Sequence, residues 1–307
     1  GGVGVVALAE PAEGLAQVFG AGIGGQPQQR VVARRRHGTR VWRILEKVLQ
    51  QPASVTSPDL ATVWTSLGWQ PSASQLALFE QLQVELRSWN SRLNLTRLVE
   101  GDDFWIAQIV DSLWPFADLI QQQQTNPTAL RLVDVGTGGG FPGLALAIAL
   151  PAAQLALVDS VQRKVEAVRA MGASLGLSQR LSFSSERIEK LGQDKRWRGQ
   201  FDWAVARAVA PAPVVAEYLV PLLNSGGQAL LYRGQWGESD ANDLAAAAQL
   251  LQARVGSVRA RELPQGRGQR HCITLHPVAT CPRRYPRPIG IPAKQPLSGI
   301  KAGAGCA

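Results

Sequence analysis

The sequence predicts an α/β fold in which a mostly parallel, doubly wound sheet follows an N-terminal helical extension. From residue 130 onward, short apolar runs alternate with helical stretches, a pattern typical of such sheets. A glycine-rich loop follows the first of these runs. Before residue 126, apolar residues instead recur at three- and four-residue steps, which indicates helices. The chain has 307 residues and 45% apolar content, enough for a packed core.

Four regions follow along the chain. Residues 1–50 are rich in Gly, Ala and Gln without periodicity, so we predict a disordered extension or wrongly assigned coding sequence. Residues 51–126 form the helical region, with Ser74 as a candidate helix cap. Residues 127–278 form the α/β domain. Residues 279–307 are rich in Pro and Arg, and we predict an extended basic tail.

The α/β domain divides into elements that alternate in order. We predict strands at 132–135, 155–158, 181–184, 204–206, 228–232, 257–261 and 271–276. We predict helices that begin at Pro142 and at residues 163, 213 and 240, because proline suits a first helical turn and the other segments have helical patterns. The last two strands form a pair.

The net charge of +9 is concentrated at the two ends of the chain. Residues 252–307 carry ten basic side chains and one acidic one, and residues 1–51 carry seven and three. The residues between them carry four more acidic than basic side chains. An arginine-rich segment suits a polyphosphate partner such as RNA, because each phosphate contact releases counterions.

Several classes of protein are disfavoured by composition. No run reaches the roughly 20 apolar residues that a membrane helix needs, and the first residues lack the basic flank of a signal peptide. We therefore expect a cytoplasmic protein. Three cysteines without a C-x-x-C pair and three scattered histidines favour neither a disulfide framework nor a metal site.

The most informative stretch is the glycine-rich loop at residues 134–143, which follows the first strand and opens a helix. Glycines there let a ligand approach the backbone above the strand ends. Gly138, Gly140 and Gly143 fit the spacing of a dinucleotide site, but that register begins two residues late. The register from Gly136, with Asp134 before it, resembles the S-adenosylmethionine (SAM) loop of class I methyltransferases. A carboxylate suits a sulfonium cation better than two phosphates.

The second strand ends in an acid that supports a nucleoside ligand. Asp159 lies 23 residues after Gly136, where a carboxylate can accept hydrogen bonds from both ribose hydroxyls. The same residue could instead cap the helix that follows. Together the loop and the acid favour a SAM or nucleotide cofactor, SAM before the others. A P-loop is excluded, because no Gly-Lys-Ser/Thr follows.

Ordered motifs give the chain a resemblance to the bacterial 16S ribosomal RNA guanine-N7 methyltransferases, long called glucose-inhibited division protein B. The motifs span residues 70–297 and lie at 89–96 (WNSRLNLT), 111–112 (DS), 132–160, 187–189 (RIE), 201–208, 234–235 (GQ) and 284–296. The resemblance implies a Rossmann-like class I fold, SAM as cofactor, and 16S rRNA or the small ribosomal subunit as partner. Two positions depart from the family pattern: Gln108 replaces a common His, and Arg233 replaces a Lys.

The resemblance also implies roles for individual residues. The cofactor would be bound by Gly136, Gly138, Gly140, Phe141, Asp159, Ser160, Ile188, Glu189 and Arg207. No residue is assigned as catalytic, because N7 of guanine carries a free lone pair and needs no general base. Candidates for positioning the guanosine are Arg207, Arg233, Asn90, Asn94, Thr96 and Asp111. Phosphate contacts would come from Arg283, Arg284, Arg287 and Lys294.

The sequence also allows purely structural roles for some of these residues, and other functions for the chain. Asn94 could simply end a helix, and Ile188 could be a core residue. The chain could be a SAM methyltransferase acting on another RNA, a small molecule or a protein, or a non-catalytic SAM- or RNA-binding module. An NAD-dependent oxidoreductase is disfavoured by the loop register. We expect a monomer that binds neither metal nor membrane.

Overall fold

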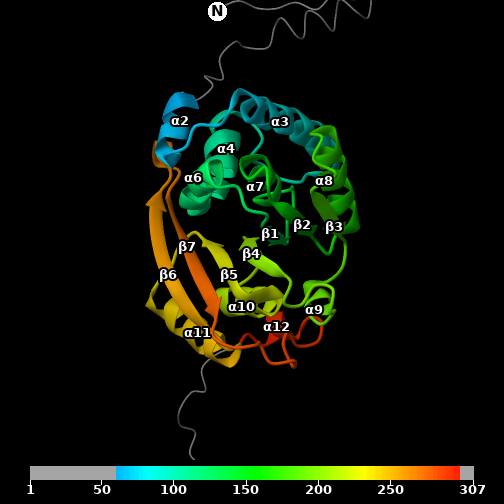
Figure 1. Ribbon diagram of the computed structural model, residues 1–307, viewed down its shortest axis with the longest axis vertical. Helices are drawn as coiled ribbons and strands as arrows, with labels where there is room; N and C mark the ends of the chain where they lie inside the picture. The colour runs from blue at the N-terminus through cyan, green and yellow to red at the C-terminus, as the bar shows by residue number, and fades with distance from the viewer. Residues whose placement is uncertain (1–59, 298–307) are drawn as a thin grey trace, which may run out of the picture. The chain divides into compact units, whose positions relative to one another are not determined.

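A seven-stranded sheet lies at the centre of residues 60–297, the part of the chain that the computed structural model describes (Figure 1). Its strand order is β3-β2-β1-β4-β5-β7-β6. The predicted extension at residues 1–50 lies outside the described residues. The strands are β1 (Arg131–Val135), β2 (Gln154–Val158), β3 (Leu181–Ser184), β4 (Phe201–Arg207), β5 (Leu223–Arg233), β6 (Ala253–Glu262) and β7 (Gln269–Pro277).

The first five strands are parallel, and β7 runs antiparallel between β5 and β6. All seven predicted strands are present, so the prediction of a mostly parallel α/β sheet is confirmed. The chain moves outward from β1 to β3, and then returns to place β4 on the other side of β1. In open α/β sheets, ligands bind in the crevice at such a reversal, beyond the carboxyl ends of the strands.

Helices cover both faces of the sheet. Successive side chains of a strand point to opposite faces, and both faces are apolar and buried. On β1, Leu132 faces one hydrophobic core and Val133 faces the other. The first face is covered by α7 (Gly143–Ala149), α8 (Gln162–Ser174) and the N-terminal helices (Figure 1). The second face is covered by α9 (Ile188–Leu191), α10 (Ala212–Leu219), η3 (Val220–Leu222) and α11 (Glu238–Leu250).

The region before the sheet is helical, as predicted, over its described part. Its elements are α2 (Leu60–Leu67), α3 (Ala73–Leu93), α4 (Gly101–Phe104), the π-helical turn η1 (Trp105–Val110), α5 (Asp111–Leu113), η2 (Trp114–Phe116) and α6 (Ala117–Thr125). The prediction of Ser74 as the cap of α3 is wrong by two residues. The helix begins at Ala73, so Ser72 is the residue that can accept a hydrogen bond from the Gln75 amide.

The C-terminal segment is packed against the domain, so the prediction of an extended tail is wrong over its described part. Tyr285 and Leu297 are buried in the core beside α10. The short helix α12 (Ile291–Lys294) lies within the same segment, on the α10 side of the molecule (Figure 1). Two buried carboxylates, Glu217 and Glu189, hold the segment in place.

The helices between residues 60 and 297 include none with the length and apolar character that a membrane span requires.

Candidate functional site

A cavity of about 550 Å³ opens at the carboxyl ends of β1, β2 and β4. This volume lies within the range of pockets that bind cofactors and small molecules. Its wall includes the glycine-rich loop, the acid after β2 and the arginine at the end of β4, which lie far apart in the sequence. The sheet therefore brings the main predicted elements of the site together.

The glycine-rich loop exposes its backbone to the cavity. The amides of Gly136 and Thr137 donate to the carbonyl oxygen of Val158, at 2.8 and 2.9 Å, which ties the loop to the end of β2. Gly138 has a φ of +56°, and the nearest atom to a Cβ built there would be 3.9 Å away. The backbone conformation at this position therefore favours glycine, and the space beside it is open for a ligand.

Asp134 lies behind the loop and holds it in shape. Its Oδ2 accepts hydrogen bonds from Thr137 Oγ1 at 2.7 Å and from the Gly143 amide at 2.8 Å. The side chain is 1% exposed and is not among the residues that line the cavity. Burial raises the pKa of this carboxyl to about 6, and its Oδ1 has no hydrogen-bond partner. Any effect of Asp134 on a bound cation would be electrostatic.

Asp159 lines the cavity beside Ser160. Its carboxylate accepts from the Gly138 amide at 3.0 Å and from the Val161 amide at 2.9 Å. Each carboxylate oxygen keeps a further lone pair for a ligand hydroxyl. Asp159 is not the cap of α8, because the residue before that helix is Val161. The geometry is thus compatible with binding a ribose.

Seven of the nine predicted cofactor-binding residues line this cavity: Gly136, Gly138, Phe141, Asp159, Ser160, Ile188 and Arg207. Gly140 does not line it. A Cβ at Gly140 would lie 2.6 Å from Leu144 Cδ1, so glycine is needed there for packing against α7. Glu189 does not line it either. Its carboxylate is 2% exposed, pairs with Arg187 and accepts from the Gly290 amide.

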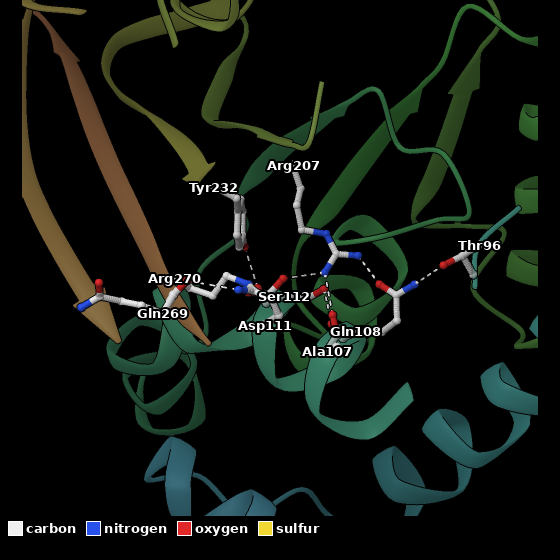
Figure 2. Close-up of polar contacts among 9 residues, drawn as sticks. All are labelled: Thr96, Ala107, Gln108, Asp111, Ser112, Arg207, Tyr232, Gln269 and Arg270. Carbon is white, nitrogen blue, oxygen red and sulfur yellow. Dashed lines mark hydrogen bonds and ion pairs between the residues drawn. The ribbon is translucent and has the colours of Figure 1, made fainter. Parts of the chain in front are cut away.

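Arg207 enters the cavity wall from the end of β4 and is held by the N-terminal helices (Figure 2). Its guanidinium donates to Asp111 Oδ2 at 3.0 Å and to the carbonyl of Ala107 at 3.3 Å. It also donates to Gln108 Oε1, and the amide of Gln108 donates to Thr96 Oγ1 at 3.2 Å. The network therefore fixes three polar groups that line the cavity.

The same network joins the N-terminal helices to the far strands of the sheet (Figure 2). Tyr232 in β5 donates its hydroxyl to the carbonyl of Ser112 at 2.6 Å, and burial raises its pKa well above 10. The Nε of Arg270, in β7, lies 3.6 Å from Asp111 Oδ1. Asp111 thus lies between two arginines, and no ligand is needed to neutralise it.

The other predicted guanosine-side residues have structural partners. Asn94 ends α3 in the left-handed conformation, with a φ of +48°, so its reading as a helix terminator describes its place in the structure. Asn90 Oδ1 accepts from the Thr96 amide at 2.8 Å. Arg233 donates to the carbonyl of Ala210, which lines the cavity, at 2.9 Å. Of these residues, Thr96 itself lines the cavity.

The N-terminal region also reaches the glycine-rich loop directly. A Cβ built at Gly139 would lie 3.5 Å from Leu95 Cβ and 3.8 Å from Leu86 Cδ1. Leu95 and Thr96 both line the cavity. The turn that follows α3 therefore forms part of the cavity wall, above the loop.

Sequence reasoning missed several residues of the cavity wall. Lys164 and Arg187 bring positive charge, and Tyr218 and Ala293 come from α10 and α12. Ala208 also lines the cavity and has a φ of +56°, a conformation that non-glycine residues rarely adopt. The first turn of α8 could have indicated Lys164 as a neighbour of the acid. No sequence signal indicates Ala293, because its place depends on the folding of the C-terminal segment.

The four predicted phosphate contacts differ in their surroundings. Arg283, Arg284 and Lys294 are exposed. Arg284 lies over the ring of Tyr285, with 5.1 Å between its Cζ and the ring centroid. Arg287 instead pairs with Glu217, which is fully buried. Within residues 60–297, no cluster of three His, Cys, Asp or Glu side chains could hold a metal ion.

Comparison with known proteins gives consistent matches. The family model "GidB: rRNA small subunit methyltransferase G" matches residues 75–273. "Ribosomal RNA small subunit methyltransferase G" of Synechococcus sp. (strain WH7803) is 56% identical over 251 residues, covering 82% of this chain and 96% of that protein. The protein of the same name from Parasynechococcus marenigrum (strain WH8102) is 55% identical over 252 residues. The alignment covers 82% of this chain and 100% of that protein.

Among solved structures, the magnesium protoporphyrin IX methyltransferase of Synechocystis PCC 6803 with bound SAM aligns with a TM-score of 0.44 and 13% identity. The alignment covers 67% of this chain and 98% of that one. The family match is much stronger: it spans the glycine-rich loop, the acid after β2 and the arginine after β4 in one continuous segment. The chain therefore belongs to the rRNA small subunit methyltransferase G family.

Proposed function

We propose that this enzyme transfers a methyl group from SAM to N7 of a guanosine in 16S ribosomal RNA. The observation that carries the proposal is the family match, because it spans every residue of the cavity wall except Ala293. The cavity is large enough for a nucleoside cofactor, and Gly138 leaves space next to its backbone.

The cavity residues fit the chemical groups of SAM. Asp159 would accept hydrogen bonds from the ribose, and Gly138 would let the amino-acid end approach the backbone. Ile188 would contact the adenine as an apolar wall. SAM supplies an activated methyl group on a sulfonium. The protein has to hold that donor at one end of the cavity and exclude water from it.

The substrate side needs positioning and no proton acceptor. N7 of guanine carries an in-plane lone pair and no proton, so the protein has to align this atom with the methyl carbon. Arg207, Gln108 and Thr96 lie on the cavity wall and hold one another through hydrogen bonds. We assign them to positioning of the guanosine.

The partner is the small ribosomal subunit or its RNA, and the enzyme acts as a monomer in the cytoplasm. Support for an RNA partner comes from the family name and from the excess of basic residues after residue 252. Arg283, Arg284 and Lys294 are exposed and available for phosphate contacts. Arg287 is engaged with Glu217, so it is not assigned to RNA.

The test is methyl transfer from labelled SAM to small ribosomal subunits purified from cells that lack this gene. We expect label in 16S rRNA and, after mapping, at one guanosine that becomes sensitive to N7-specific strand cleavage. Subunits from cells that carry the gene should accept no label, because the site is already modified. Label in protein, in free metabolites or at another base would contradict the proposal.

A further inference from the structure

The C-terminal segment at residues 281–297, which we call the C-terminal strap, is held by an ion pair between Arg287 and the buried carboxylate of Glu217. The guanidinium of Arg287 donates from Nε to Glu217 Oε1 at 2.9 Å and from Nη2 to Oε2 at 2.7 Å. The backbone amide of Arg287 donates to the same Oε1 at 2.8 Å. Glu217 is 0% exposed. Bidentate contacts between an arginine and a carboxylate fix the relative orientation of the two side chains as well as adding stability.

A second buried carboxylate fastens the strap at a later point. Glu189 Oε1 accepts from the Gly290 amide at 3.0 Å, directly before α12. Arg198 holds the first part of the strap by donating to the carbonyls of Tyr285 at 2.6 Å and Cys281 at 2.7 Å. The strap is therefore tied to the body of the domain before, at and after Arg287.

Each carboxylate that ties the strap is the chain neighbour of a residue in the cavity wall. Glu189 follows Ile188, and Glu217 precedes Tyr218; both Ile188 and Tyr218 line the cavity. The strap completes this side, because Ala293 of α12 lines the same cavity. One pair of elements, α9 and α10, thus presents apolar or aromatic groups to the ligand and charged groups to the strap.

We propose that the C-terminal strap is a working part of the cofactor site, and that the Arg287–Glu217 pair positions Ala293 against the bound nucleoside. The inference rests on the proposed function of the cavity as the SAM site. Ile188 and Ala293 are apolar and line the same cavity, which suits the flat face of a base. Arg287 is then a positioning residue for the cofactor, and the exposed arginines of the strap remain free for RNA.

The direct test enlarges the side chain that meets the ligand. Ala293→Phe should weaken SAM binding about tenfold in calorimetric titration, a loss of about 1.4 kcal/mol. The matched control is Gln295→Phe, two residues further along the strap, at an exposed position that does not line the cavity. We expect its SAM affinity to equal that of the wild type.

The positioning role is tested at Arg287. Arg287→Ala should raise the KM for SAM about tenfold while kcat at saturating SAM changes less than about twofold, because the pair acts through the strap and not on the methyl group. Arg287→Lys keeps the charge and loses the two-pronged contact, so we expect an intermediate KM. Ile289→Ala, in the same strap and 57% exposed, should leave the KM for SAM unchanged.

A measurement on the wild-type protein avoids variants that fail to fold. Hydrogen exchange should slow at residues 290–297 when SAM is added, because the ligand contacts α12. If wild-type protein binds SAM but exchange in the strap and the affinity of Ala293→Phe are both unchanged, the strap proposal is overturned while the proposed function stands. If wild-type protein binds no SAM at all, both are overturned.

Discussion

At the scale of single residues, Asp159 both holds two loop amides and borders the cavity. Its carboxylate accepts from the amides of Gly138 and Val161, and the residue lines the cavity in which we propose that SAM binds. Asp159→Ala should therefore lower SAM affinity about tenfold to hundredfold, since a hydrogen bond to a charged group contributes about 1.5–3 kcal/mol. Calorimetric titration measures the change.

The matched control for this variant is Asp118→Ala, a surface carboxylate with a side chain that is 91% exposed. Its SAM affinity should equal that of the wild type. Circular dichroism should give the same secondary structure for both variants, because Asp159 belongs to a loop. An Asp159→Ala variant that binds SAM normally would remove the ribose role assigned here.

Asp134 makes the stability of the domain depend on pH in an unusual direction. Burial raises its pKa from 3.8 to about 6, so between these values the native carboxyl keeps its proton while the unfolded one has lost it. The native state then binds more protons, and its stability falls as the pH rises through this window. The loss is up to about 3 kcal/mol and is complete above about pH 6 to 7.

Asp134→Asn removes this titration. The free energy of unfolding of the wild type minus that of the variant should fall between about pH 4 and pH 7, measured by urea denaturation at each pH. Subtracting the variant cancels the groups that titrate in both proteins. A difference that stays flat across this range, or rises, would mean that the carboxyl ionises normally in the folded protein.

At the scale of elements, the packing of α7 on the sheet depends on the last glycine of the loop. A Cβ at Gly143 would lie 2.0 Å from Leu157 Cδ2 in β2 and 2.8 Å from Asp134 Oδ2. Gly143→Ala should therefore destabilise the domain by about 1–3 kcal/mol through overpacking. Thermal unfolding followed by circular dichroism measures this effect.

Gly226→Ala serves as the comparison for that substitution. Gly226 is exposed, and the nearest atom to an added Cβ there would be 3.9 Å away. We expect the midpoint of unfolding to change little in this variant. Equal midpoints for both variants would show that α7 shifts to accept the methyl group at no cost.

The elements that the sequence predicts well are those with a strong local pattern. The continuous apolar runs of β1 and β2 are buried on both faces of the sheet, and the apolar stripe of α3 is buried on the side that its periodicity indicates. The cap of α3 lies two residues before its predicted position, because Ser72 and Ser74 are both suitable residue types. Periodicity fixes the buried face of a helix more firmly than its first residue.

The parts that sequence reasoning places wrongly depend on distant partners. The C-terminal segment has the composition of an extended tail, yet Arg287 pairs with Glu217, 70 residues earlier. Gly290 likewise donates to Glu189, 101 residues earlier. Within the site, Gly140 has the right spacing but packs against Leu144. Spacing identifies which residues can approach a ligand, and only the fold decides which of them do.

At the scale of the whole molecule, charge should govern the encounter with RNA. Arg283 and Arg284 are exposed neighbours on the C-terminal strap. A variant with both changed to Ala should bind small subunits more weakly, and the slope of log affinity against log salt should decrease by about 0.7–0.9 for each phosphate that is no longer neutralised. Filter binding over a range of KCl concentrations measures this slope.

The informative comparison for the double variant is Arg287→Ala. Its guanidinium is occupied by Glu217, so its removal should leave the salt slope unchanged even where cofactor affinity falls. A salt slope that is equal in the wild type and the double variant would show that Arg283 and Arg284 do not contact RNA phosphates.

The close approach of Gly139 to Leu95 has a consequence for how this enzyme can diversify. The helices that precede the sheet do not form an interchangeable attachment, because the turn that follows α3 contacts the glycine-rich loop, where we propose that SAM binds. A graft of these helices from a distant relative would disturb donor binding together with target choice. New target preferences in this lineage should therefore arise by point changes within the existing wall, and helix-swapped chimaeras should lose both properties together.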